Sequence, residues 1–349
     1  MSVPKGKLVT VEIGSSWTRV FVIDHEKENR LKILSSASLP TSVGDLKFAV
    51  QNLFEKLDIT PKEHSLIWTS SLDEATSVTE DFKGIFVPFG EVKKNLSAWL
   101  RSEGYPSCTV LDAGAGLMRS SFKAAEVGSF LTFAIGESEL ENHLANLSLH
   151  PQTVPETKNE MEIAESLMRV SFAKKAAELG EASNILVTGS LVAAHPNLAR
   201  IALVVLDVLG EGKVAEVVVD KGSFGNCWGA ALTKYRELAG FEIDFLEKLG
   251  TFVSLGGTGR VELDYGLKNL QEVTADQNEI ALIPAGSGQK VKISFGLGKE
   301  KRKFEASGGS FGILIDARPK PLALVFGSAS SQHAMLSWRE ALEKVELIK

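Results

Sequence analysis

The sequence predicts an α/β protein with two related lobes and an added β-rich module. Its 349 residues exceed the usual size of one compact domain. Strand-like and helix-like segments alternate up to residue 238, and this order of elements runs through twice. After residue 250, helical periodicity gives way to short apolar alternations between glycines. The expected parts are a first lobe over 1–105, a second lobe over 106–245, a β sandwich or barrel over 246–328 and a closing helix over 329–349.

The first lobe is predicted to begin with three antiparallel strands. Apolar runs at 8–13 and 17–24 are separated by Gly14, Ser15 and Ser16, which is a β-hairpin signal. Apolar residues at helical spacing then alternate with short strand-like runs. The further expected elements are a strand at 31–38, a helix at 46–57, a strand at 65–69 and a helix at 92–100.

The second lobe is predicted to repeat this plan from a strand at 109–112. Two more strands are expected at 118–125 and 130–135, in the place of the second and third strands of the first lobe. Alternating helices and strands follow. They are a helix at 159–179, a strand at 185–188, a helix at 198–209, a strand at 214–219 and a helix at 228–238.

The β-rich module lacks helical periodicity until its end. Strands are expected at 251–255, 280–283, 291–295 and 311–315. Residues 332–347 are again apolar at helical spacing, so we expect a closing helix that packs back on the first lobe.

Composition and charge exclude several classes of function. The net charge is −6 and the pI is near 5.7, so no basic footprint predicts nucleic acid or an anionic membrane as a partner. Cys108 and Cys227 each lie in an apolar stretch and are expected to be reduced core thiols. The start of the chain lacks the apolar core of a signal peptide, and the apolar stretch 201–209 is short and carries Asp207. We therefore expect a soluble, cytoplasmic protein.

The first candidate motif is the predicted hairpin turn after Glu12. A tight turn of Gly14, Ser15 and Ser16 exposes backbone N–H groups and hydroxyls that can hold phosphate oxygens. Glu12, at the end of the strand, could reach a hydrated Mg²⁺, which favours carboxylates and water as ligands. The alternative is an ordinary Gly-Ser turn without a ligand.

Two further motifs fall in the predicted second lobe. Asp112 ends a buried strand and is followed by Gly114 and Gly116, in the same position in the lobe as the first motif. If the two lobes face each other, the two acidic turns converge on one cleft. A strand also enters Gly189 and Ser190, where the missing side chain lets a flat ring approach the backbone. The alternatives are a plain turn and close helix–strand packing.

Together these segments resemble the phosphate-1, phosphate-2 and adenosine motifs of the actin-like ATPase superfamily, which includes actin, Hsp70 and sugar kinases. The superfamily has two ribonuclease H-like lobes, which is the fold the resemblance implies. Within it, the sequence is most similar to the MutL-type proteins associated with glutamate mutase, which are unrelated to the mismatch-repair proteins of that name. The segments that carry the resemblance are 12–19, 112–116, 187–194, 217–220 with 225–232, and 308–318.

The resemblance implies an ATP-binding cleft with Mg²⁺. It also implies a role in maintaining or reactivating an adenosylcobalamin-dependent mutase, with the nucleotide, the mutase or a full-length relative as partners and ATP hydrolysis as the activity. Glu12 and Asp112 would be the catalytic residues that face the metal or the attacking water. The residues implied to bind the nucleotide are Gly14, Ser15, Ser16, Thr18, Gly114, Gly116, Gly189 and Ser190, the last two of them near the adenosine.

Two other functions remain open beside a nucleotide-gated accessory ATPase. Glu12 replaces the usual Asp of the superfamily, Leu117 and Met118 replace hydroxyl residues, and Ser190 replaces a second glycine. Of these departures, Leu117 and Met118 favour a degenerate scaffold that keeps the fold, does not hydrolyse ATP and works through its β-rich module. A small-molecule kinase on the same fold is the third hypothesis, and it requires a catalytic carboxylate beside an acceptor pocket.

Overall fold

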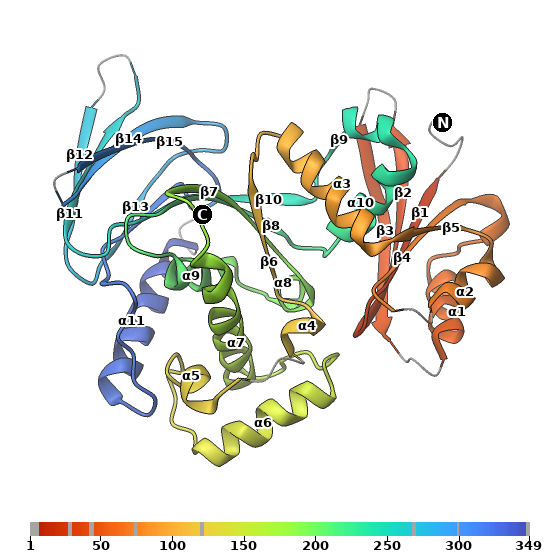
Figure 1. The fold of residues 1–349 in the computed structure, drawn as a ribbon, viewed down its shortest axis with the longest axis horizontal. Coiled ribbons are helices and arrows are strands. Elements are labelled where there is room, and N and C mark those ends of the chain that lie inside the picture. The colour runs from red at the N-terminus through yellow and green to blue at the C-terminus, as the bar shows by residue number, and fades with distance from the viewer. Residues whose placement is uncertain are drawn as a thin grey trace. The chain divides into compact units, whose positions relative to one another are not determined.

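The computed structural model describes residues 7–26, 30–41, 45–72, 75–118, 122–266, 270–298 and 300–346. It is a mixed α/β structure with two six-stranded sheets and one four-stranded sheet (Figure 1), which confirms the predicted α/β class. The chain divides into two compact units. The first unit consists of Met1–Pro106 and Asp220–Leu246, and the second consists of Ser107–Val219 and Glu247–Lys349.

The first unit is built on a sheet with the strand order β5-β4-β1-β2-β3-β9. The first three strands form the predicted antiparallel meander, and β4 runs parallel to β1. The strands are β1 (Leu8–Ile13), β2 (Trp17–Glu26), β3 (Arg30–Pro40), β4 (Ser65–Ser70), β5 (Ile85–Pro88) and β9 (Glu242–Ile243). The helices are α1 (Leu46–Lys56), α2 (Ala75–Phe82), α3 (Phe89–Ser102) and α10 (Gly225–Lys234), with short turns of 3₁₀ helix at Pro61–Glu63 and Arg236–Gly240.

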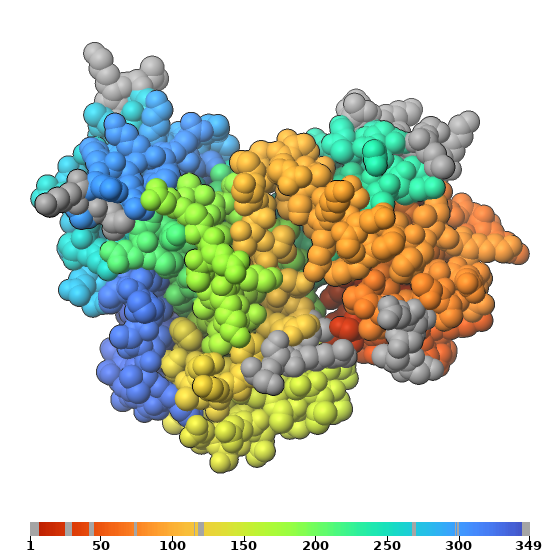
Figure 2. Space-filling model, in the orientation of Figure 1, coloured from red at the N-terminus to blue at the C-terminus, as the bar shows by residue number. Residues whose placement is uncertain are grey.

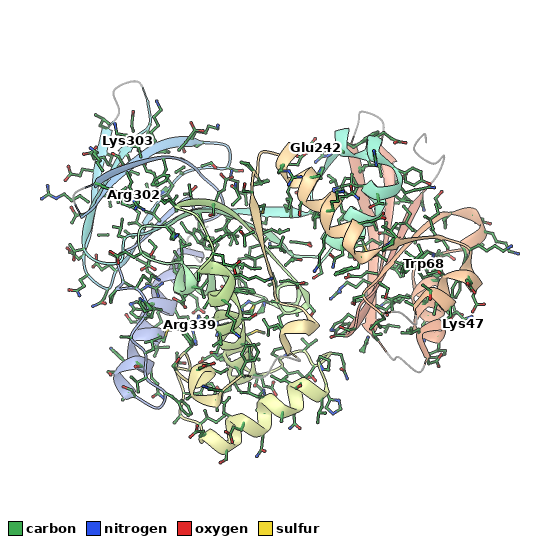
Figure 3. All side chains as sticks on the ribbon, viewed as in Figure 1. Lys47, Trp68, Glu242, Arg302, Lys303 and Arg339 are labelled. Carbon is green, nitrogen blue, oxygen red and sulfur yellow. The ribbon has the colours of Figure 1, made fainter. Side chains whose placement is uncertain are left out.

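Alternation along β1 sends its side chains into two different layers, because successive residues of a strand point to opposite faces of the sheet. Val9, Val11 and Ile13 pack with α1 and α2 in an apolar core that includes Trp68, which Figure 3 labels. Glu12 points to the opposite face, where it contacts the side of α10. One strand therefore supplies both the core of the unit and the polar layer beneath α10.

Helix α10 belongs to the first unit, whereas the sequence prediction placed residues 220–245 in the second lobe. The helix packs against α3, and Gly229 lies at this contact. A Cβ atom at Gly229 would come within 2.6 Å of the carbonyl oxygen of Val92, so a side chain does not fit there. This contact joins segments far apart in the sequence, which element order alone does not reveal.

The second unit is built on a sheet with the strand order β13-β16-β10-β8-β7-β6. Within it β6, β7 and β8 run parallel, and the register pairs Asp112 with Thr188. The strands are β6 (Cys108–Asp112), β7 (Ala182–Thr188), β8 (Val214–Asp220), β10 (Leu246–Ser254), β13 (Ile280–Ile283) and β16 (Ile313–Asp316). The helices are α4 (Ala115–Met118), α5 (Ala124–Gly128), α6 (Glu137–Leu149), α7 (Lys158–Ala176), α8 (Ser190–Ala194), α9 (Leu198–Val208) and α11 (Ala329–Glu346).

The second unit does not repeat the antiparallel strands of the first, so the strands predicted at 118–125 and 130–135 are wrong. Met118 ends α4, residues 124–128 form α5, and residues 130–135 contain no strand, while 119–121 lie outside the described residues. Ala124, Val127 and Leu131 are all buried in the core of this unit. Their spacing of three and four residues suits the turns of a helix and not the alternation of a strand.

A four-stranded sheet of the order β12-β11-β14-β15 covers one face of the second unit. Its inner residues pack on side chains of β8, β10, β13 and β16, while α7 and α9 pack on the other face of the six-stranded sheet. The region 246–328 therefore contributes three strands to the six-stranded sheet as well as this separate layer. The four strands are β11 (Gly259–Asp264), β12 (Leu270–Ala275), β14 (Lys290–Leu297) and β15 (Glu300–Ser307).

The closing helix α11 packs on α9 and β13 of the second unit, so the expectation that it packs on the first lobe is wrong. Among the side chains of α11 that the structure describes, Met335 and Leu342 are apolar and buried. Arg339, labelled in Figure 3, donates a hydrogen bond to Glu162 of α7. Thr132 also donates to this carboxylate, through its backbone N–H and its hydroxyl. These polar and apolar contacts fix α11 to the helical layer of its own unit.

Helix α6 lies on the surface of the second unit, as Figure 2 shows in yellow-green, and only Leu140 and Leu147 of it are buried. Across the part of the chain that the structure describes, none of the helices combines the length and apolar character needed to cross a bilayer.

Candidate functional site

The predicted hairpin of the first unit forms, and its tip is a tight turn. Glu12 pairs with Arg19 and Ile13 pairs with Thr18 in the antiparallel ladder. The N–H of Gly14 donates to the carbonyl oxygen of Trp17 over 3.0 Å, which closes the turn around Ser15 and Ser16. A Cβ at Gly14 would approach that same oxygen to 2.9 Å, so the turn favours glycine.

Hydroxyl groups surround this hairpin tip. The hydroxyls of Thr18 and Thr41 lie 3.0 Å apart, and Ser70 at the end of β4 donates to the carbonyl oxygen of Ile13 over 2.7 Å. The hydroxyl oxygen of Ser16 is buried and has no hydrogen-bond partner among the described residues. A buried hydroxyl without a partner is costly, so the hydrogen-bonding capacity of Ser16 is left for a ligand or water.

Glu12 lies beside the hairpin, but its carboxylate is already held by the protein. Asn226 of α10 donates to its Oε1 atom over 2.7 Å, and Arg19 donates to its Oε2 atom over 3.3 Å. The carboxylate is buried, and its charge is offset by Arg19. A carboxylate that is held in this way joins α10 to the sheet.

The start of α10 sets the environment of Glu12. Asp220 at the end of β8 accepts hydrogen bonds from the N–H groups of Phe224 and Gly225, over 2.9 and 2.8 Å, and so fixes the first turn of the helix.

Cys227 is fully buried one residue beyond Asn226. Burial and the nearby charge of Glu12 raise the pKa of this thiol, so it remains protonated at neutral pH, as predicted for a reduced core cysteine.

The second unit brings two of the predicted motifs side by side. Ala113 donates a backbone hydrogen bond to the oxygen of Thr188 over 2.8 Å, and Leu191 donates to the oxygen of Ala113 over 3.2 Å. The turn after β6, with Asp112 and Gly114, therefore adjoins the turn after β7, with Gly189 and Ser190. Asp112 is exposed at the end of its strand, while Gly116 lies in α4.

Gly189 makes this contact between the two turns possible. Its φ of 111° and ψ of 168° belong to a region of backbone conformation that is essentially restricted to glycine. A Cβ at this position would lie 2.5 Å from the carbonyl carbon of Ala113 and 2.6 Å from the nitrogen of Gly114. The glycine is therefore explained by close packing of backbone on backbone, and the same packing places both turns at one edge of the sheet.

The candidate residues thus fall into two groups, one in each unit. The approach of Glu12 to Asp112 across a shared cleft stays a prediction, as do their catalytic and metal-binding roles. Among the described residues, no three or more His, Cys, Asp or Glu side chains gather in an arrangement that could hold a metal ion.

A buried ionic cluster in the second unit was not predicted. The cluster consists of Arg169, Asp207, Asp316, Arg318 and Lys320. Asp207 accepts from Arg169 and from Arg318, over 2.6 Å in each case, and Asp316 accepts from Arg318 and Lys320 over 2.8 Å. Asp207 could have indicated this cluster from the sequence, because it is a carboxylate within the apolar stretch of α9.

Glu165 extends this cluster along α7. Asn197 donates its N–H to His195 Nδ1, so His195 Nε2 carries the proton and donates to Glu165 over 2.9 Å. Burial by itself would raise the pKa of Glu165. The hydrogen bond from His195 and the charges of Arg169 and Arg200 outweigh burial and lower this pKa to about 2.

We expect Glu165 to make the stability of the protein depend on acid pH. Its pKa in the folded protein is about 2, below the ordinary value of 4.5, so its contribution is complete above pH 4.5 and is lost as the pH falls towards 2. The loss corresponds to about 3 kcal/mol of unfolding free energy. Urea unfolding followed by circular dichroism between pH 5 and pH 2 should show this dependence in the wild type. In the variant Glu165→Gln, the fall of the unfolding free energy with pH should be smaller by the part that Glu165 contributes. Glu178→Gln, at an exposed position, should show the same fall as the wild type. Equal pH dependence in all three proteins would contradict the assignment.

Comparison with known proteins gives low sequence similarity throughout. No family model and no curated protein matches the sequence. Among solved structures, component A of (R)-2-hydroxyglutaryl-CoA dehydratase from Acidaminococcus fermentans is 13% identical with a TM-score of 0.40, and the match covers 67% of this chain and 99% of that one. The ethanolamine utilization protein EutJ from Carboxydothermus hydrogenoformans is 13% identical with a TM-score of 0.40, covering 66% and 90%. A ROK family glucokinase from Streptomyces griseus, in complex with glucose and AMPPNP, is 15% identical with a TM-score of 0.40, covering 66% and 100%. At these identities and TM-scores the likenesses do not assign a function to this chain.

Proposed function

We propose that the chain is a nucleotide-binding protein that takes ATP. The observation that supports this best is the pair of adjoining turns in the second unit, where Gly189 packs directly on the backbone of Ala113 and Gly114. Both turns follow parallel strands at their carboxyl ends, the edge at which open α/β sheets bind ligands. Asp112 and Ser190 supply polar side chains there, and Gly189 keeps the two turns together.

The hairpin of the first unit is the second part of the proposal. Gly14, Ser15, Ser16 and Thr18 would bind phosphate oxygens, in line with the resemblance of this segment to a phosphate-binding motif. Support comes from the tight turn at Gly14 and from the buried hydroxyl of Ser16, which has no partner among the described residues. A phosphate oxygen would satisfy this hydroxyl.

The experiment that tests nucleotide binding is calorimetric titration with MgATP, supported by thermal shift. Wild type should bind ATP and melt at a higher temperature in its presence, since a ligand that binds the folded state stabilises it. Asp112→Ala should weaken binding at least about tenfold. Its matched control is Asp276→Ala, a second exposed aspartate of the same unit, which should bind like wild type. No effect of MgATP on the wild type, or equal effects of the two variants, would reject the proposal.

Whether bound ATP is hydrolysed separates an ATPase from a degenerate scaffold. The hydrogen bonds from Arg19 and Asn226 to Glu12 favour the scaffold, because they tie the carboxylate that the ATPase hypothesis assigns to the metal or the water to the protein itself. Phosphate release by wild-type protein above the rate of Asp112→Ala would favour the ATPase, and binding without release would favour the scaffold.

The proposed partner is inferred from the sequence resemblance alone. We propose an accessory or reactivating role towards a cobalamin-dependent mutase, with ATP binding as the signal that changes affinity for the partner. Reactivation of an inactivated glutamate mutase by the chain with ATP, measured against the chain without ATP, tests this role separately from nucleotide binding.

A further inference from the structure

The second unit contains a cavity that belongs to neither candidate turn. Its volume is about 590 Å³, within the range of small-molecule sites. It lies between α5, α7 and α9, and residues 209–213, which lead into the amino end of β8, form part of its wall. The turns at Asp112 and Gly189 lie instead at the carboxyl ends of β6 and β7, which run parallel to β8. The cavity and the turns are therefore at opposite ends of the strands.

Most of the wall of this cavity is apolar. Side chains from α7, α9 and the segment after Lys320 line it, with one aromatic ring from the loop after α5. The main contributors are Phe130, Val170, Ala173, Val208, Leu209 and Leu322. Ala173 is exposed, so the cavity opens to solvent along the outer side of α7. Such a wall suits the apolar body of a small ligand.

The polar part of the wall is one side of the buried ionic cluster. Arg169, Asp207 and Lys320 line the cavity, and their side chains are 1%, 0% and 3% exposed. Arg169 donates from Nε to Asp207, and Lys320 donates to Asp316 and to the carbonyl oxygen of Leu206. The Nη2 atom of Arg169 is buried and has no hydrogen-bond partner within the described part of the chain. This guanidinium therefore lines the cavity and has one N–H group without a partner.

The cluster also carries more positive than negative charge. Arg169, Arg318 and Lys320 are three cations, while Asp207 and Asp316 are two carboxylates. Glu165 and Arg200 adjoin the cluster, and Arg200 in turn lies 4.0 Å from the carboxylate of Glu343, whose side chain is 34% exposed, so the excess of one positive charge is that of the five buried groups alone. Burial, followed by the charge of Arg318, lowers the pKa of Lys320, against the opposing charges of Asp316 and Asp207. A buried unpaired charge is unfavourable, so a monoanion at this wall would be stabilising.

The other charged residues of the cavity wall are either exposed to water or already hydrogen-bonded. Glu126 and Glu211 are exposed, so water screens their charge. Lys213 donates its ammonium to the carbonyl oxygen of Leu179. These groups leave Arg169 as the buried donor towards which an anion would be drawn.

We propose that this cavity binds a small organic carboxylate with an apolar body, of the size of a medium-chain fatty acid. The carboxylate would accept a hydrogen bond from Arg169 Nη2 and offset the excess positive charge of the cluster. The apolar body would lie along α7 at Ala173 and against Leu322. This site is independent of the nucleotide proposed above, so either can fail without the other.

The test is calorimetric titration without nucleotide, with octanoate, 1-octanol and octylammonium below their aggregation concentrations. Octanoate should bind, 1-octanol should bind at least about tenfold more weakly, and octylammonium should not bind. These three probes share one chain and differ in charge. Equal binding of octanoate and octanol would show that the cluster does not recognise the anion, and no binding of octanoate would reject the site.

Two variants with the same substitution test the location. Ala173→Phe places a ring in the cavity at an exposed position of α7, and it should weaken octanoate binding at least about tenfold. Ala145→Phe places the same ring at an exposed position of α6, outside the cavity, and should leave binding unchanged. Both positions are on the surface of helices, so both variants should fold. An equal loss in both, or no loss in Ala173→Phe, would place the bound octanoate elsewhere and overturn the proposal.

Discussion

Replacing Gly189 by alanine is expected to reduce the unfolding free energy by about 3 kcal/mol. The φ of 111° and ψ of 168° at this position are essentially reserved for glycine, and the new Cβ would overlap backbone atoms of Ala113 and Gly114. Backbone cannot move aside as the end of a flexible side chain can. The turn after β6 must therefore shift, and with it Asp112. Urea denaturation measures the loss, and MgATP titration of the folded variant measures its effect on the proposed nucleotide site.

Gly116→Ala is the control for this substitution. Gly116 follows the same turn, yet a Cβ there would meet no atom within 4 Å. Because Gly116 lies in α4, where alanine is a better helix former than glycine, this variant should be as stable as wild type or slightly more so. If Gly189→Ala were as stable as Gly116→Ala, the close packing of the two turns would not be the reason for the glycine.

The sequence predicted elements well wherever local pattern decides the structure. The hairpin at Gly14 to Ser16 forms because a short polar turn joins two apolar runs, and both features are local. The predicted strands of the second lobe failed because the repeat of the first lobe was extended to residues 118–135. There the spacing of Ala124, Val127 and Leu131 already favours helical turns.

Contacts between distant segments could not be predicted in this way. The alternation in the β-rich region indicates strands, but it does not tell which sheet a strand joins, and β10, β13 and β16 join the six-stranded sheet. For the candidate site, the sequence identified the turn residues but not the partners of Glu12. Arg19 is its neighbour across the hairpin, whereas Asn226 is brought to it by the packing of α10. The second kind of contact depends on the tertiary fold.

Asp207→Asn is the second substitution with a large expected effect, a loss of about 3–5 kcal/mol of unfolding free energy. Its carboxylate is fully buried and accepts from Arg169 and Arg318 at once. Asparagine removes the charge and leaves three buried cations, Arg169, Arg318 and Lys320, with Asp316 as the remaining carboxylate of the cluster. Urea denaturation of wild type and variant at neutral pH measures the difference.

A double variant distinguishes the charge from the packing. In Arg169→Met with Asp207→Leu, one cation and one carboxylate are removed together, and Arg318 and Lys320 keep Asp316. Because a buried ion pair replaced by apolar side chains of similar volume is often close to neutral, most of the stability lost in Asp207→Asn should return. Asp81→Asn, which breaks the exposed pair with Lys47, should cost less than about 1 kcal/mol. A double variant as unstable as Asp207→Asn would mean that the geometry of the hydrogen bonds, and not the balance of buried charge, holds α7 against α9. In that case the charge of the cluster would not affect its stability, and an anion at Arg169 would gain no stabilisation from that charge.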